Sequence, residues 1–123
     1  MTRIVSALAL AMPLLASAAS SAAAGTTGRE LLQGCRTAVE NRALDFQAGL
    51  CLGTIVTVLN VTQPSVVYGP YVVCKDPAAS VTQALRIVLR YMEANPHQLD
   101  KELAGIALNA MQLVWPCPRP KAK

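Results

Sequence analysis

The chain has 123 residues, enough for one domain and few for two. It carries 11 basic and 7 acidic residues, and the basic ones are scattered rather than gathered into a stripe. Aromatic residues make up only 4% of the chain, so base stacking has little support. Composition and charge therefore argue against nucleic acid as a partner.

The first 24 residues have the composition of a secretory signal. Arg3 gives a positive start, residues 4–15 are apolar, and small residues follow up to Ala24. The apolar run is shorter than the roughly 20 residues that span a bilayer, so we expect a cleaved signal peptide over residues 1–24. Residues 25–123 are then expected to form one domain that is exported into an oxidising compartment, with no membrane insertion after cleavage.

Two helices are predicted in the first half of this domain. The first is expected to begin at Thr27, because Thr27 and Glu30 match the S/T-x-x-E capping box. Asp45 can cap a second, mostly apolar helix over residues 46–61. A strand is the alternative for this second segment, because it is rich in β-branched residues.

Gly49 and Gly53 lie one turn apart on the second predicted helix. Glycine lowers helix stability, so close packing against another backbone is the expected compensation. The segment after this helix, residues 61–73, contains two prolines and a glycine, which exclude a helix. We expect either an irregular loop or two short extended runs that turn at Gly69 and Pro70.

A third helix is predicted from a second capping box. Ser80 and Gln83 match that motif, and an apolar stripe at helical spacing follows. Asp76 and Pro77 offer an earlier start for the same helix. Asn95 marks its expected end.

The fourth helix is expected to be capped by Asn95 and to start at Pro96, where the missing N–H does no harm. Its apolar residues recur at three and four from Leu99 to Val114, and Pro116 stops it. The predicted fold is therefore all-α, a small disulfide-bonded four-helix bundle built from two helical hairpins.

Four cysteines in an exported chain predict two disulfides. If helices one and two form an antiparallel hairpin that turns near residue 43, Cys35 and Cys51 lie level with each other. If the second hairpin turns near residues 95–96, Cys74 and Cys117 also lie level. We therefore expect the pairs Cys35–Cys51 and Cys74–Cys117. The two crossed pairings remain the alternatives.

Neither a metal centre nor a catalytic site is expected. The cysteines lack C-x-x-C spacing, and the single histidine, His97, stands far from any cysteine and has no acidic-plus-serine context. The carboxylates fall in caps and on polar faces, without a close pair among apolar residues. We predict no catalytic residue, no metal and no cofactor, so the chain is not expected to be an enzyme.

Several motifs follow one another in a characteristic order. They are a cysteine in the first helix, Cys51-Leu52-Gly53 opening an apolar helix, a cysteine near a proline, an Asn-Pro helix junction and a closing Trp115-Pro116-Cys117-Pro118. This order resembles the Rap/Tai family of periplasmic immunity proteins from type VI secretion systems. The resemblance implies a compact all-helical domain, often a homodimer. It also implies a partner, a peptidoglycan amidase effector that the domain binds and blocks.

If the chain inhibits such an enzyme, we expect contact through Tyr68, Gly69, Pro70 and Tyr71. Two tyrosines beside a stiff turn offer amphipathic contact area at low entropic cost. The alternative is that the valines of this segment fold it over the core, with the tyrosines as a lid. A competing function is a periplasmic helical protein of general envelope or stress-chaperone function, without a dedicated toxin partner.

Overall fold

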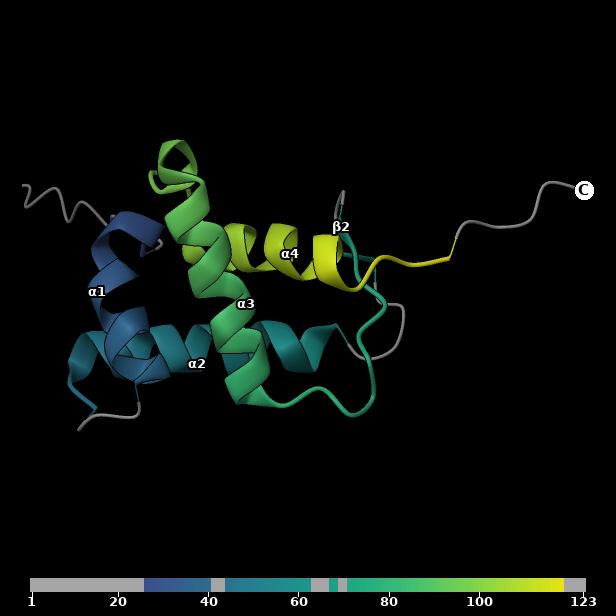
Figure 1. The fold of residues 1–123 in the computed structure, drawn as a ribbon, viewed down its shortest axis with the longest axis horizontal. Coiled ribbons are helices and arrows are strands. Elements are labelled where there is room, and N and C mark those ends of the chain that lie inside the picture. Colours follow the sequence, from purple (N-terminus) through teal and green to yellow (C-terminus); the bar gives the residue numbers. More distant parts are fainter. Residues whose placement is uncertain (1–25, 41–43, 63–66, 69–70, 119–123) are drawn as a thin grey trace, which may run out of the picture.

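The computed structural model describes residues 26–40, 44–62, 67–68 and 71–118. The predicted signal peptide, residues 1–24, lies outside the described residues. The helices confirm the all-α fold class, and a short β hairpin lies between the second and third (Figure 1). The elements are α1 (Gly28–Val39), α2 (Phe46–Val61), β1 (Val67–Tyr68), β2 (Tyr71–Val72), α3 (Val81–Ala94), the 3-10 turn η1 (Pro96–Gln98) and α4 (Leu103–Val114).

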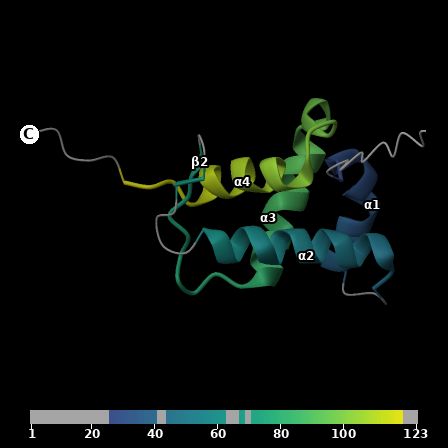
Figure 2. The ribbon, with the colours of Figure 1, turned by 180° about the vertical axis from the view of Figure 1, so that it is seen from behind.

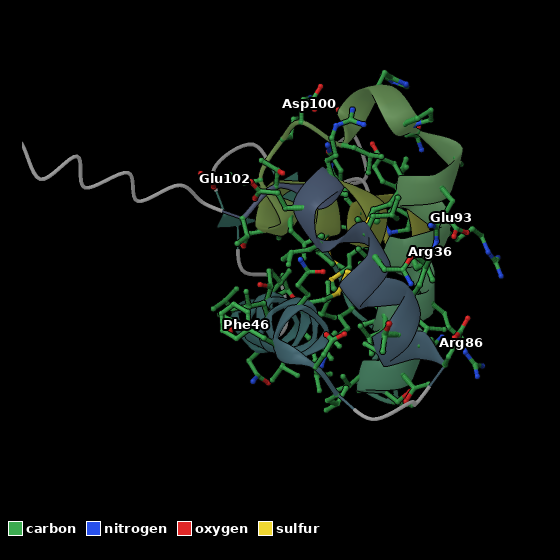
Figure 3. The ribbon with its side chains drawn as sticks, turned by 90° about the vertical axis from the view of Figure 1, so that its left-hand side faces the viewer. Arg36, Phe46, Arg86, Glu93, Asp100 and Glu102 are labelled. Carbon is green, nitrogen blue, oxygen red and sulfur yellow. A yellow bond between two sulfur atoms is a disulfide. The ribbon has the colours of Figure 1, made fainter. Side chains whose placement is uncertain are left out.

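The helices form two crossed layers. One layer holds α1 and α3, and the other holds α2 and α4 (Figures 1 and 2). Consecutive helices pack on each other, as two helical hairpins require, but they cross steeply instead of lying antiparallel. Figure 3 shows this crossing from the end of α2, with α1 and α3 running across the view.

Gly34 allows α1 and α2 to cross at close range. A Cβ atom at Gly34 would lie 2.5 Å from the carbonyl carbon and oxygen of Gln47, so a larger residue would collide with the backbone of α2. Cys35 and Cys51 meet beside this crossing and form a disulfide, with their Cα atoms 5.3 Å apart. The predicted pair Cys35–Cys51 is confirmed.

Local capping explains where α1 and α2 begin. The Thr27 hydroxyl accepts a hydrogen bond from the Glu30 N–H at 3.3 Å, and the Glu30 carboxylate accepts one from the Thr27 N–H at 3.0 Å. The Asp45 carboxylate accepts from the Ala48 N–H at 2.8 Å. Residues 46–61 are helical throughout, so the helix prediction for α2 is confirmed and the strand alternative is wrong.

The start of α4 differs from the prediction. α3 begins after the cap at Ser80, as expected, but Pro96 starts only the turn η1, and α4 begins at Leu103. The intervening carbonyls are used elsewhere: that of Leu99 accepts from the Arg29 N–H, and that of Lys101 accepts from the Gly28 N–H. The carbonyls that an earlier start of the fourth helix would use thus accept from the start of α1 instead.

A single core lies between the two layers and fixes their relative position. All four helices contribute to it, together with Val73 after the hairpin and Trp115 after α4. Its largest fully buried apolar side chains are Leu31, Ile55, Met92, Leu103, Ile106, Met111, Val73 and Val88. Burial of this apolar surface is the main favourable term in folding, so the surfaces described next rest on a well-packed support.

Candidate functional site

The predicted contact segment is a β hairpin beside the end of α4. β1 and β2 pair antiparallel, with Tyr68 opposite Tyr71 (Figure 1). The prediction of two short extended runs is therefore confirmed, and the alternative of an irregular loop is wrong. Gly69 and Pro70 lie outside the described residues. The structure thus brings the backbones of the two tyrosines together at this end of the molecule.

Three interactions join the base of the hairpin to the residues after α4. Val73 pairs with Pro116 in an antiparallel bridge, and the Cys74 N–H donates to the carbonyl of Trp115 at 2.9 Å. Cys74 and Cys117 form the second disulfide, with Cα atoms 4.8 Å apart, so this predicted pair is also confirmed. Val73 is 1% exposed and packs on the core. This agrees, for this residue, with the alternative in which the valines fold the segment over the core.

An apolar groove of about 250 Å³ opens between α3 and α4. Leu113 and Val114, 71% and 50% exposed, form its α4 side, and Ile87 and Tyr91 lie on its α3 side. The prediction placed Val114 in the buried stripe of the last helix, which is wrong, because the last turn of α4 extends past α3 (Figure 1). The groove therefore ends close to the anchored base of the hairpin.

Sequence reasoning missed Leu113 as a surface residue. Its position falls outside the spacing of three and four that the buried residues of α4 follow. A large apolar residue that departs from the buried stripe of its helix is the signal that could have found it. The same reasoning assigned no role to the arginines of α3.

Arg86 and Arg90 lie one turn apart on α3, and Arg90 lines the apolar groove. Arg86 extends away from the body of the protein in Figure 3. Within the part of the chain that the structure describes, neither arginine forms an ion pair. Glu93 on the same helix is engaged by Arg36 of α1, whose Nε lies 3.0 Å from its carboxylate. One positive charge, that of Arg90, therefore lines the apolar groove, and that of Arg86 lies one turn away in the adjoining polar hollow.

The close packing predicted for Gly49 and Gly53 is wrong, because both glycines lie on the outer face of α2. A Cβ atom at Gly49 or Gly53 would meet nothing within 4 Å in the described structure, and both glycines are exposed. They line a shallow, uncharged hollow together with Ala104 of α4. Phe46, 78% exposed, stands at the near end of this helix (Figure 3). The close backbone approach is made by Gly34 instead.

A surface ion pair ties α1 to the turn before α4. The Arg29 Nε donates to the Asp100 carboxylate at 2.8 Å. This hydrogen bond, and then the charge of the partner, lower the pKa of Asp100 and raise the pKa of Arg29. Both side chains are well exposed, so solvent screens the pair.

The described residues lack the grouping of side chains that a metal centre requires. Among them, no three His, Cys, Asp or Glu side chains gather as metal ligands would. The four cysteines are all oxidised, and His97 is exposed in η1. Over the same residues, no helix has the length and apolar character of a membrane span. The candidate contact features of the described residues are the hairpin, the apolar groove with its neighbouring arginines, and the outer face of α2 with Phe46.

Residues 27–117 match the model of a family described as Rap1a immunity proteins, which is well over half of the chain. The chain belongs to the Rap1a family of immunity proteins. The match runs from the cap of α1 to Cys117, so the Rap1a region contains all four helices, the hairpin and both disulfides.

The Rap1a assignment agrees at the level of the family with the resemblance found in the motifs. No curated protein and no solved structure matches this Rap1a chain. Membership of an immunity family implies a partner effector protein and an inhibitory role. The contact residues Tyr68, Gly69, Pro70 and Tyr71 remain a prediction.

Proposed function

We propose that this protein is a periplasmic immunity protein that neutralises a type VI effector, a peptidoglycan amidase, by stoichiometric binding. The observation that carries the proposal is the Rap1a match over residues 27–117, which includes the whole described fold. Inhibition then requires a complementary surface rather than a reacting group. Two disulfides suit an oxidising compartment, which supports the periplasm as the location.

The amidase as target is supported by the motifs that resemble the Rap/Tai family, including Trp115-Pro116-Cys117-Pro118. The hairpin with Tyr68 and Tyr71 is the proposed inhibitory contact. Its base is held by a disulfide, a backbone hydrogen bond and a bridge, so little conformational entropy remains to be lost there on binding. Tyrosine is also among the residues that most often carry interface energy.

Titration of enzyme activity tests the proposal directly. The probe is a purified peptidoglycan amidase effector of type VI secretion, and the readout is the release of soluble fragments from purified peptidoglycan. We expect activity to fall linearly with added protein and to vanish at a fixed molar ratio. Full activity at a tenfold molar excess of the protein would contradict inhibition of this enzyme.

Location and protection are tested in cells that express the amidase in the periplasm. The full chain is expected to prevent lysis, whereas a variant that lacks residues 1–24 is expected to accumulate in the cytoplasm and give no protection. Equal protection by both forms would contradict a periplasmic site of action. Lysis despite periplasmic accumulation of the full chain would contradict the immunity role.

A further inference from the structure

We infer that the groove between α3 and α4 is a second contact surface for the effector, and that it receives an apolar side chain flanked by carboxylates. This inference rests on the proposed function and adds to it the chemistry of the partner surface. The groove includes Leu113 and Val114 on α4 and Ile87, Tyr91 and Arg90 on α3. Arg86 lies one turn before Arg90 on the same helix.

Leu113 and Val114 support contact with an apolar group. These two residues are adjacent, large and largely exposed, and they stand at the rim of a groove whose other wall is also mainly apolar. Single exposed apolar residues are ordinary on protein surfaces, but apolar residues that gather around a hollow are typical of interaction sites. The groove volume of about 250 Å³ suits one or two side chains of a partner rather than a whole helix.

The charges of Arg90, which lines the groove, and of Arg86, one turn away on α3, favour an acidic partner surface. Arg86 and Arg90 lie four residues apart on one helix, so they repel each other. The nearest acidic residue along α3, Glu93, already accepts a hydrogen bond from Arg36. A partner carboxylate would relieve this repulsion and could form two parallel hydrogen bonds with a guanidinium group. The complementary surface is therefore acidic around an apolar centre.

The same charges argue against two other occupants of the groove. A second copy of this chain that docked through the same face would bring its own arginines towards Arg86 and Arg90. The C-terminal residues of this chain include Arg119, Lys121 and Lys123, which are also basic. Like charges across an interface oppose association. An acidic surface on another protein is the occupant that fits.

The position of the groove supports joint use with the hairpin. Val114 is the last residue of α4, and Pro116, two residues later, pairs with Val73 at the hairpin base. A partner that engages the hairpin therefore has the groove within reach. Two neighbouring contacts on one rigid support would strengthen binding beyond either contact alone.

Binding of the purified amidase to four double variants tests the inference by calorimetry. Leu113→Ala/Val114→Ala removes the apolar rim, and Arg86→Glu/Arg90→Glu reverses the charge. Their matched controls are Phe46→Ala/Leu44→Ala, at exposed apolar positions by the start of α2, and Lys75→Glu/Lys101→Glu, with the same change in net charge. We expect each groove variant to raise Kd at least about tenfold and each control to change it less than about threefold.

Ionic strength gives a second readout. Affinity of the wild-type protein is expected to weaken between 50 mM and 500 mM salt, and the charge-reversed variant is expected to lose most of that dependence. Helical circular dichroism establishes that each variant is folded. If the charge reversal unfolds the protein, Arg86→Gln/Arg90→Gln replaces it under the same criterion.

The outcomes separate the inference from the function on which it rests. If the wild-type protein binds the amidase and both groove variants bind as tightly, the inference is wrong and the immunity function stands. If the wild-type protein does not bind, the proposed function fails and the inference fails with it. If light scattering shows that Leu113→Ala/Val114→Ala turns a dimer into a monomer, the groove belongs to a second copy and the inference is overturned.

Discussion

Val73 pairs with Pro116, and the next residue on each side, Cys74 and Cys117, continues the same connection as a disulfide. The hairpin base and the residues after α4 are thereby held as one unit. The carbonyl of Trp115, the residue before Pro116, accepts a hydrogen bond from the Cys74 N–H. Trp115 is the only tryptophan of the chain and is 9% exposed, so its fluorescence reports on this unit.

Removal of this disulfide by Cys74→Ser/Cys117→Ser should lower the free energy of unfolding by about 4 kcal/mol, because it releases a loop with a sequence separation of 43. Urea denaturation followed by circular dichroism measures the loss. At low urea, Trp115 fluorescence should shift to the red while helicity stays near that of the wild type. An unchanged denaturation midpoint would show that the bridge and the hydrogen bond suffice without the disulfide.

Gly34→Ala should destabilise the protein by roughly 1–3 kcal/mol, because the added methyl group collides with the backbone at Gln47 and the two helices must separate. Gly53→Ala is the matched control on a helix with open space at the same atom, and it should stabilise by up to about 1 kcal/mol. Thermal melting of both variants gives the comparison. Equal shifts in the two Tm values would mean that the crossing is looser than the structure indicates.

The Arg29–Asp100 pair predicts that the free energy of unfolding depends slightly on pH in the acidic range. Asp100 has a lowered pKa in the folded protein, so the stabilisation is present above the ordinary pKa of an aspartate and is lost as pH falls through the folded value. In Arg29→Gln, the Asp100 pKa should return towards its ordinary value. Carboxyl NMR titration at low salt measures both proteins. The same Asp100 pKa with and without Arg29 would contradict an effect of the pair.

Tyr68→Ala/Tyr71→Ala should abolish inhibition of the amidase while leaving helical circular dichroism and Tm close to those of the wild type. The reason is that a contact residue contributes to the complex and a lid residue contributes to the fold. Inhibition assays and thermal melting of the same samples distinguish the two. A sharp fall in Tm would favour the lid, and retained inhibition with an unchanged Tm would exclude both interpretations.

Much of the helical content was predictable because its signals are local. The caps at Thr27, Asp45 and Ser80 involve residues three apart, and each forms the hydrogen bond that its motif predicts. The disulfide pairing was also predicted correctly, although the helices cross where antiparallel hairpins were assumed. The predicted pair Cys35–Cys51 is correct despite this error, because both cysteines lie near the point where α1 and α2 cross.

The remaining features depend on contacts between distant segments. The predicted start of α4 was wrong. The carbonyls of Leu99 and Lys101 accept hydrogen bonds from N–H groups at the start of α1, and no pattern within residues 95–103 indicates these distant contacts. The close approach was assigned to Gly49 and Gly53, but it is made by Gly34, because the crossing point depends on the packing of the whole bundle. The groove beside Leu113 lies between α3 and α4, and the last turn of α4 extends past α3 (Figure 1).

The two disulfides occupy separate stretches of the chain. The loop that Cys35 and Cys51 close ends before Cys74 opens the second, so the loops are neither nested nor interlocked. In a chain that is exported from its N-terminus, Cys35 emerges first and its partner Cys51 is the next cysteine. Cys74 follows, and its partner Cys117 is the last. If the chain is exported in this way, oxidation in the order of appearance would yield the native pairs without later exchange between disulfides.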